Sequence, residues 1–142
     1  MKQRHSYADL LYHLVPRTKN REPFIGGEEE EHTLHALLRK KAHDLDAWIE
    51  EVGGWKEHIH LLLRTRPTVA LSAVYGRMKG FAAWAWHKRW PDRPFGWNDG
   101  VWVKTVDPES CETLRMYIRN QREHQAQNTE RPRWEAQDSA SL

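Results

Sequence analysis

Two histidines, His58 and His60, stand two residues apart in a segment that the sequence predicts to be a β-strand. Because successive side chains of a strand point to opposite faces, both imidazoles leave the same face, with Cα atoms ~7 Å apart. Ile59, Leu61 and Leu63 take the other face, which is therefore predicted to be core. Two converging imidazoles suit a divalent metal ion. The alternative is a pair of solvent-facing histidines without a function, which the spacing alone does not exclude.

A tyrosine and a glutamine, Tyr117 and Gln121, lie four residues apart in a predicted helix over residues 108–125, so their side chains are neighbours. The core stripe of this helix is predicted to comprise Cys111, Leu114 and Ile118. A tyrosine hydroxyl, with an ordinary pKa of ~10, is a nucleophile that needs help from a metal or a base. Gln121 offers a neutral oxygen ligand. The alternative for Tyr117 is an ordinary half-buried core tyrosine.

The elements that must position these residues follow from hydrophobic periodicity and turn signals. Strands are predicted over residues 7–18, 45–55, 57–65 and 95–106, and helices begin at Glu28, Leu71 and Pro108. Pro16 would confine the end of the first strand to a sheet edge or a bulge. The order predicts an α+β fold, a ferredoxin-like split βαβ two-layer sandwich with an added C-terminal catalytic helix. We expect one domain over residues 1–127 and a loosely held polar tail over residues 128–142.

Composition narrows the class of protein. The chain has 142 residues, 30% of them charged, and a mean hydropathy of −0.88, which suits one well-solvated domain. No apolar run approaches the ~20 residues that a bilayer demands, and the N-terminus shows no apolar stretch of signal type. We therefore expect a cytoplasmic protein with no membrane partner. The single cysteine, Cys111, excludes an internal disulfide and a cysteine-based metal site.

Positive charge and aromatic rings gather in residues 58–106, which hold eight lysines and arginines, two aspartates and five of the eight tryptophans. Cations for phosphates and rings for unpaired bases are typical of a groove for single-stranded nucleic acid. The residues that we predict to bind DNA are Arg64, Arg77, Lys79, Trp84 and Lys88. The alternative is that the tryptophans fill a small core while the lysines and arginines solvate its surface.

Three sequence segments together resemble one protein family. They are HIHLLL at 58–63, YIRNQ at 117–121 and YHLVPRTKNREP at 12–23. Their order and separation are similar to those of the insertion-sequence-200-like transposases, the single-tyrosine branch of the HUH enzymes that act on single-stranded DNA. The chain departs from that pattern at Lys56-Glu57, where the family usually has Pro-Asp, and at Pro16. Neither departure touches a predicted ligand or the nucleophile.

The resemblance implies a mechanism. His58, His60 and Gln121 would hold one divalent cation, Mg²⁺ or Mn²⁺, and Tyr117 would attack the scissile phosphate to give a 5′-phosphotyrosine link. That link conserves the phosphodiester energy, and the sequence contains no GxxxxGK[ST] phosphate loop for ATP. The implied partners are the single-stranded hairpin ends of a mobile element. The family also implies a homodimer in which each site combines the His pair of one chain with the tyrosine helix of the other.

Other functions fit parts of the sequence. An RNA-binding module is suggested by KGFAAWAW at 79–86, but its fifth position, Ala83, should be aromatic, and the stretch reads as helix. A catalytically silent single-stranded nucleic-acid-binding protein of the same fold is the main alternative, against which the intact tyrosine, His pair and glutamine argue. A metal hydrolase would need a further ligand pattern that the sequence does not display.

Overall fold

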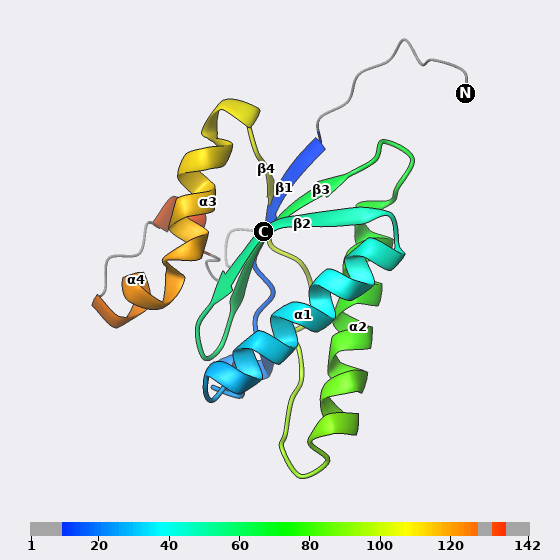
Figure 1. The fold of residues 1–142 in the computed structure, drawn as a ribbon, viewed down its shortest axis with the longest axis vertical. Helices are drawn as coiled ribbons and strands as arrows, with labels where there is room; N and C mark the ends of the chain where they lie inside the picture. The colour runs from blue at the N-terminus through cyan, green and yellow to red at the C-terminus, as the bar shows by residue number, and fades with distance from the viewer. Residues whose placement is uncertain (1–9, 128–131, 136–142) are drawn as a thin grey trace.

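A computed structural model describes residues 10–127 and 132–135 of the chain. Its centre is a four-stranded antiparallel sheet with helices on both faces (Figure 1). The strands, which lie in the order β2-β3-β1-β4, are β1 (Leu10–Leu14), β2 (Ala47–Gly54), β3 (Ile59–Thr65) and β4 (Val103–Thr105). One helix follows β1 and another follows β3, so the predicted split βαβ arrangement is confirmed.

Helices α1 (Glu28–Asp44) and α2 (Leu71–Arg89) cover one face of the sheet and bury the larger apolar core (Figure 1). Glutamates fill the first turn of α1 and basic residues its last turn, which suits the helix dipole. Ile59, Leu61 and Leu63 of β3 are buried in this core, as predicted. Successive side chains of β3 point to opposite faces of the sheet. One face therefore carries the apolar side chains of the larger core, and the other carries the histidines.

The C-terminal helical segment lies on the opposite face (Figure 1). The single helix predicted over residues 108–125 is instead a 3₁₀ turn (Pro108–Ser110), α3 (Cys111–Arg119) and α4 (Gln121–Gln127). Asp107 caps the start as predicted, because its carboxylate accepts a hydrogen bond from the backbone N–H of Glu109. The break falls at Asn120, whose backbone leaves the helical conformation. Gln121 is therefore the first residue of a new helix.

Helix α3 packs directly on the sheet. Leu114 and Ile118 join Leu11 and Leu62 in a second, smaller apolar cluster. Gly53 of β2 lies beneath Ile118, and a Cβ atom at this position would come within 1.9 Å of the Ile118 carbonyl oxygen. Only glycine allows the helix backbone to approach the strand this closely.

Ion pairs also hold α3 to the sheet. Arg115 contacts Glu50 at 3.2 Å, and Arg119 contacts Glu51 at 2.9 Å. The register of β2 shifts between Ile49 and Glu51, which is the position of a β-bulge. The bulge lets two consecutive glutamates reach the same helix, although neighbouring residues of a regular strand face opposite ways.

The first and last strands are shorter than predicted. Residues 7–9 lie outside the described residues, and β1 ends at Leu14. It runs inside the sheet, between β3 and β4, so the predicted edge position of Pro16 is wrong. The regular strand ends before the proline, and isolated bridges of Arg17 with His58 and of Thr18 with Trp97 follow it. The predicted strand over residues 95–106 is reduced to β4, because a turn that ends at Gly100, where φ is 87°, interrupts it.

The predicted C-terminal tail is described only at residues 132–135; residues 128–131 and 136–142 lie outside the described part. Pro132–Trp134 form a 3₁₀ turn, and Trp134 packs against the smaller apolar cluster. This portion is therefore attached to the domain, while a domain boundary at residue 127 stays a prediction. None of the helices in the described ranges has the length and apolar character needed to cross a lipid bilayer.

Candidate active site and metal centre

The two histidines predicted to bind metal face α3, on the side of the sheet opposite the larger core. His58 directly precedes β3 and His60 lies on it. Their exposed fractions are 6% and 0%, and their ring centroids lie 5.0 Å apart. The alternative of solvent-facing histidines is therefore wrong. The two imidazoles are instead buried among polar side chains.

Each imidazole is held through its Nδ1 atom, so its Nε2 atom faces the site. His58 Nδ1 lies 2.8 Å from a carboxylate oxygen of Glu57, and His60 Nδ1 lies 2.9 Å from Nε2 of His13. Burial, with the nearby charges of His60 and Lys104, lowers the pKa of His13 to about 2, so His13 is neutral. When His60 presents a lone pair at Nε2, it must carry its proton on Nδ1 and donate it to His13. Partners of this kind orient metal-binding imidazoles.

The side chain of Gln121 reaches the same site from the start of α4. Its amide oxygen lies 3.1 Å from His58 Nε2 and accepts a hydrogen bond of 2.8 Å from the Gln125 side chain. Its amide nitrogen is buried and has no hydrogen-bond partner within the described residues. The amide oxygen is therefore the atom that Gln121 turns toward the imidazoles, as a ligand would.

Tyr117 is buried on α3 with its hydroxyl group turned into the site. Its exposed fraction is 3%, and its ring centroid lies 6.0 Å from that of His60. The ring lies between His124 and Trp134, with centroid distances of 4.5 and 4.8 Å. Its hydroxyl donates a hydrogen bond to a carboxylate oxygen of Glu135. The ring of Tyr117 is thus packed like that of a core residue, while its hydroxyl group lies among the polar side chains of the site.

Glu135 is a member of the site that sequence reasoning missed. One carboxylate oxygen lies 3.1 Å from His60 Nε2 and 3.4 Å from His58 Nε2, and the other accepts the Tyr117 hydrogen bond. The residue lies in the polar segment that the sequence predicts to be loosely held. The one available signal was the neighbouring Trp134, because a large apolar ring in a polar tail has reason to pack.

These groups change each other's protonation. Burial lowers the pKa of His60, and the hydrogen bond to Glu135 opposes this without reversing it. Burial also lowers the pKa of His58, but the hydrogen bond and charge of Glu57, together with Glu135 and Gln121, outweigh burial and raise it. Burial raises the pKa of Glu57 and of Glu135, yet their histidine partners bring both below the usual range. Two ionised carboxylates therefore flank the imidazoles, which favours a cation between them.

The donor set suits a divalent cation. Ligand atoms of His58, His60 and Glu135 all lie within 4.8 Å of one another, and the Gln121 oxygen adjoins them. Nitrogen and oxygen ligands together, with imidazoles oriented from behind, fit Mn²⁺, and the oxygen ligands fit Mg²⁺.

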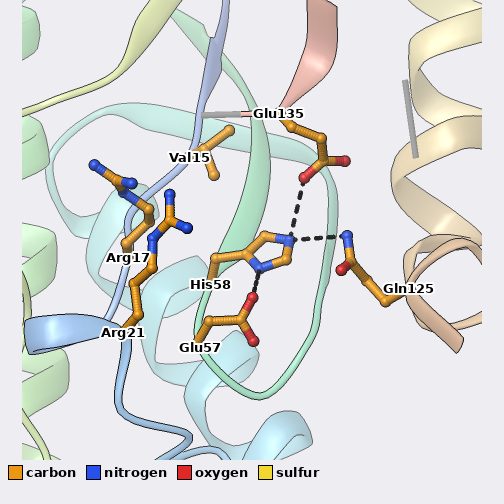
Figure 2. Close-up of a pocket in the computed structure, with 7 residues that line it drawn as sticks. All are labelled: Val15, Arg17, Arg21, Glu57, His58, Gln125 and Glu135. Carbon is orange, nitrogen blue, oxygen red and sulfur yellow. Dashed lines mark hydrogen bonds and ion pairs between the residues drawn. The ribbon is translucent and has the colours of Figure 1, made fainter. Parts of the chain in front are cut away.

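A cavity of about 220 Å³ opens beside His58. Figure 2 shows its lining, which comprises Val15, Arg17, Arg21, Glu57, His58, Gln125 and Glu135. The two arginines stand on the opposite side of the cavity from Gln125 and Glu135 (Figure 2). An anionic group that enters beside His58 would therefore meet guanidinium groups. Sequence reasoning missed these arginines, although both lie within YHLVPRTKNREP.

The five residues predicted to bind DNA fall on both sides of the sheet. Arg64, on the α3 face, donates a hydrogen bond of 2.7 Å to Glu50. The other four lie on α2, across the sheet from the histidines, and are Arg77, Lys79, Trp84 and Lys88. Lys79 donates a hydrogen bond of 2.9 Å to the carbonyl of Asn98 and so supports the turn before β4. DNA contact by these residues stays a prediction. The four residues on α2 are separated by the sheet from the candidate active site.

Most tryptophans of residues 58–106 are packing residues. Trp86 is fully buried, and Trp90 and Trp97 pack against the larger core. Trp102 meets the His13 ring edge-on at 5.0 Å. Trp84 has an exposed fraction of 59%. The alternative that tryptophans fill the core therefore describes most of this group, and Trp84 is the member with a face available for stacking.

The His pair and the tyrosine helix lie together within the described chain. The ion pairs of α3 with β2 seat the tyrosine helix on its own sheet, and Tyr117 lies beside His60 of the same chain. A homodimer and a site shared between two chains therefore stay predictions.

The chain is similar in sequence and in fold to proteins that are described as transposases. Transposases for insertion sequence element IS200 from Salmonella typhimurium and Salmonella typhi are each 28% identical over 125 residues, covering 84% of this chain and 81% of each relative. A crystal structure of a candidate transposase from Deinococcus radiodurans has a TM-score of 0.67 at 25% identity, over 85% of this chain and 97% of that one.

A further solved structure is described as a REP-associated tyrosine transposase bound to a REP hairpin. It has a TM-score of 0.60 at 14% identity, over 85% of this chain and 72% of that one, which is a likeness of fold. The family model for IS200-like transposases matches residues 6–121. Because that match spans well over half of the sequence, the chain belongs to the IS200-like transposase family.

Proposed function

We propose that this transposase cuts and rejoins single-stranded DNA with Tyr117 as its nucleophile. One observation carries the proposal. The buried Tyr117 hydroxyl donates to Glu135, whose other carboxylate oxygen reaches the Nε2 atoms of both His58 and His60. A hydroxyl nucleophile beside a metal-type donor set is the arrangement that phosphoryl transfer to tyrosine requires.

In the proposed reaction, the phenolic oxygen of Tyr117 bonds to the scissile phosphorus, and the bond from phosphorus to the 3′ oxygen breaks. The products are a 5′-phosphotyrosine link and a free 3′-hydroxyl, and the proton lost by the phenol is balanced by the proton gained at the 3′ oxygen. A second 3′-hydroxyl then reverses the step on another strand. The phosphodiester energy is retained throughout, so ATP is not required.

We assign His58, His60 and Gln121 as residues that hold Mg²⁺ or Mn²⁺. When bound, the cation polarises the scissile phosphate and offsets the charge that builds on its oxygens. The chain's own groups supply orientation, because Glu57 and His13 fix the two imidazoles from behind.

The cavity beside His58 supports a DNA strand as the substrate. Arg17 and Arg21 line it and favour a phosphate backbone. A relative in fold is described as bound to a REP hairpin, which supports a hairpin end of a mobile element as the partner.

Incubation of labelled single-stranded hairpin DNA with the protein and Mg²⁺ or Mn²⁺ tests the proposal. We expect a covalent protein–DNA adduct that survives a denaturing gel and is absent after chelation of the metal. Tyr117→Phe should reduce the adduct by at least about a thousandfold, because the nucleophile is gone, while DNA affinity is kept. Tyr12→Phe is the matched control and should keep the adduct. Undiminished adduct in Tyr117→Phe would exclude Tyr117 as the nucleophile.

A catalytically silent single-stranded nucleic-acid-binding protein is the second candidate. It is favoured by the engagement of both histidines and of Tyr117 by one carboxylate, that of Glu135. Tight hairpin binding with no adduct in either metal would select this function over the first.

A further inference from the structure

The carboxylate of Glu135 stands between the groups that the proposed reaction needs. Its Oε1 atom lies 3.1 Å from Nε2 of His60 and 3.4 Å from Nε2 of His58, while Oε2 accepts the hydrogen bond of Tyr117. It thus contacts the two imidazoles on the atoms that would bind a metal. The exposed fraction of its side chain is 19%, so the carboxylate is mostly withdrawn from solvent.

The segment that carries Glu135 is anchored by contacts of its own. Trp134 packs against the smaller apolar cluster and lies 4.8 Å from the Tyr117 ring. The Lys104 side chain on β4 donates a hydrogen bond of 3.0 Å to the carbonyl of Arg133. These contacts come from β4 and α3, so Glu135 is held at the site by neighbours that are independent of its carboxylate.

Carboxylates lie on both sides of the histidines. As metal ligands both imidazoles are neutral, while Glu57 lies behind one of them and Glu135 in front of both. Two partly buried carboxylates beside neutral rings favour a cation between them. A divalent ion between the Nε2 atoms and Glu135 would be such a cation.

We propose that Glu135 is a further ligand of the divalent cation held by His58 and His60, and that its second oxygen holds the Tyr117 hydroxyl beside that cation. This inference rests on the proposed function and deepens it. With Gln121 the donor set becomes two nitrogens and two oxygens, which leaves about two of the six octahedral positions for a phosphate oxygen and water. Glu135 would then set both the affinity for the ion and the position of the nucleophile.

Calorimetric titration of the full chain with Mn²⁺ alone, without DNA, tests the inference. Glu135→Gln removes the charge at nearly constant shape, and Glu123→Gln removes one exposed charge on the neighbouring helix α4 as the matched control. We expect Glu135→Gln to weaken Mn²⁺ affinity by at least about tenfold and Glu123→Gln to leave it unchanged. Glu135→Ala should weaken it at least as much. Circular dichroism without metal verifies that each variant is folded.

Equal affinity in the wild type and in Glu135→Gln would overturn the inference. Tighter binding in Glu135→Gln would also overturn it, because Glu135 would then be covering the His pair against the ion. His60→Ala separates this inference from the proposed function on which it rests. If His60→Ala loses Mn²⁺ and Glu135→Gln does not, Glu135 is no ligand while the metal site stands. If the wild type binds no Mn²⁺, or His60→Ala keeps it, the proposed site and the Glu135 inference both fail.

Discussion

The two faces of the sheet share one strand and bury opposite kinds of chemistry. Toward α1 and α2, β3 presents Ile59, Leu61 and Leu63 to a continuous apolar core. Toward α3, the same segment presents His58 and His60 to carboxylate, amide and imidazole partners. Polar groups inside a protein need such partners, so the second face is as fully committed as the first. The residues that stabilise the core and the residues of the candidate site therefore alternate along one strand, although they face opposite sides of the sheet.

Substitutions at neighbouring positions of β3 should separate the two faces most strongly. We expect His60→Ala to abolish the DNA adduct, and Leu61→Ala to lower the free energy of unfolding by about 2–5 kcal/mol while folded protein still forms adduct. Both side chains are buried, with exposed fractions of 0% and 1%, so burial alone does not distinguish them. Chemical denaturation and the adduct gel measure the two effects. Loss of adduct in folded Leu61→Ala would break the comparison.

A more moderate effect is expected at His13, which touches the site only through His60. Replacement of His13 by leucine removes the acceptor for the His60 Nδ1 proton and should weaken Mn²⁺ affinity by about 10- to 100-fold. Calorimetry measures the change, and His32→Leu, an exposed position on α1, is the control. Unchanged affinity would mean that His60 keeps its orientation without this partner.

DNA affinity offers a smaller contrast between the faces. Substitution of both Arg17 and Arg21 by glutamine should lower the affinity for single-stranded DNA and reduce the slope of log affinity against log salt by about 1.4, because two phosphate contacts are lost. The same change at Arg77 and Lys88, on α2, should have less effect. Fluorescence anisotropy at several salt concentrations measures both. An equal or larger loss of DNA affinity in the α2 variant would mean that DNA contacts both faces of the sheet, because the sequence predicts Arg77 and Lys88 to bind DNA.

The smallest effect is expected when two inactive variants are mixed. His60→Ala and Tyr117→Phe together should regain adduct after subunit exchange, toward one working site per mixed dimer, because an intact His pair of one chain then meets an intact tyrosine of the other, as the family resemblance implies. No recovery would instead mean that each chain supplies both parts of its own site, with Arg115 and Arg119 holding α3 on its own sheet.

Local patterns in the sequence predicted the parts of the site that depend on local geometry. Alternation in β3 predicted which face carries His58 and His60, and helical spacing predicted that Tyr117 and Gln121 are neighbours. That neighbourhood survives the helix break at Asn120, because the chain continues into α4 after one non-helical residue.

Contacts between distant segments lay beyond these patterns. Glu135 reaches His60 across 75 residues through a turn that Trp134 anchors, and no periodicity encodes that docking. Composition was also misleading for the tryptophans, because the same basic and aromatic mixture describes a stacking groove and a small core. Trp86, fully buried in the core, belongs to the second kind.

The position of Tyr117, the proposed nucleophile, depends on the absence of a side chain at Gly53. Without a methyl group at Gly53, the Ile118 carbonyl oxygen rests where a Cβ atom would be only 1.9 Å away, against a minimum of about 3.0 Å for real contacts. An alanine would push this turn of α3 outward by more than an ångström, and Tyr117 is the adjoining residue. Misplacement of a reacting group by about 1 Å can cost about a hundredfold in rate. A glycine without any side chain would thus govern the speed of the proposed strand transfer.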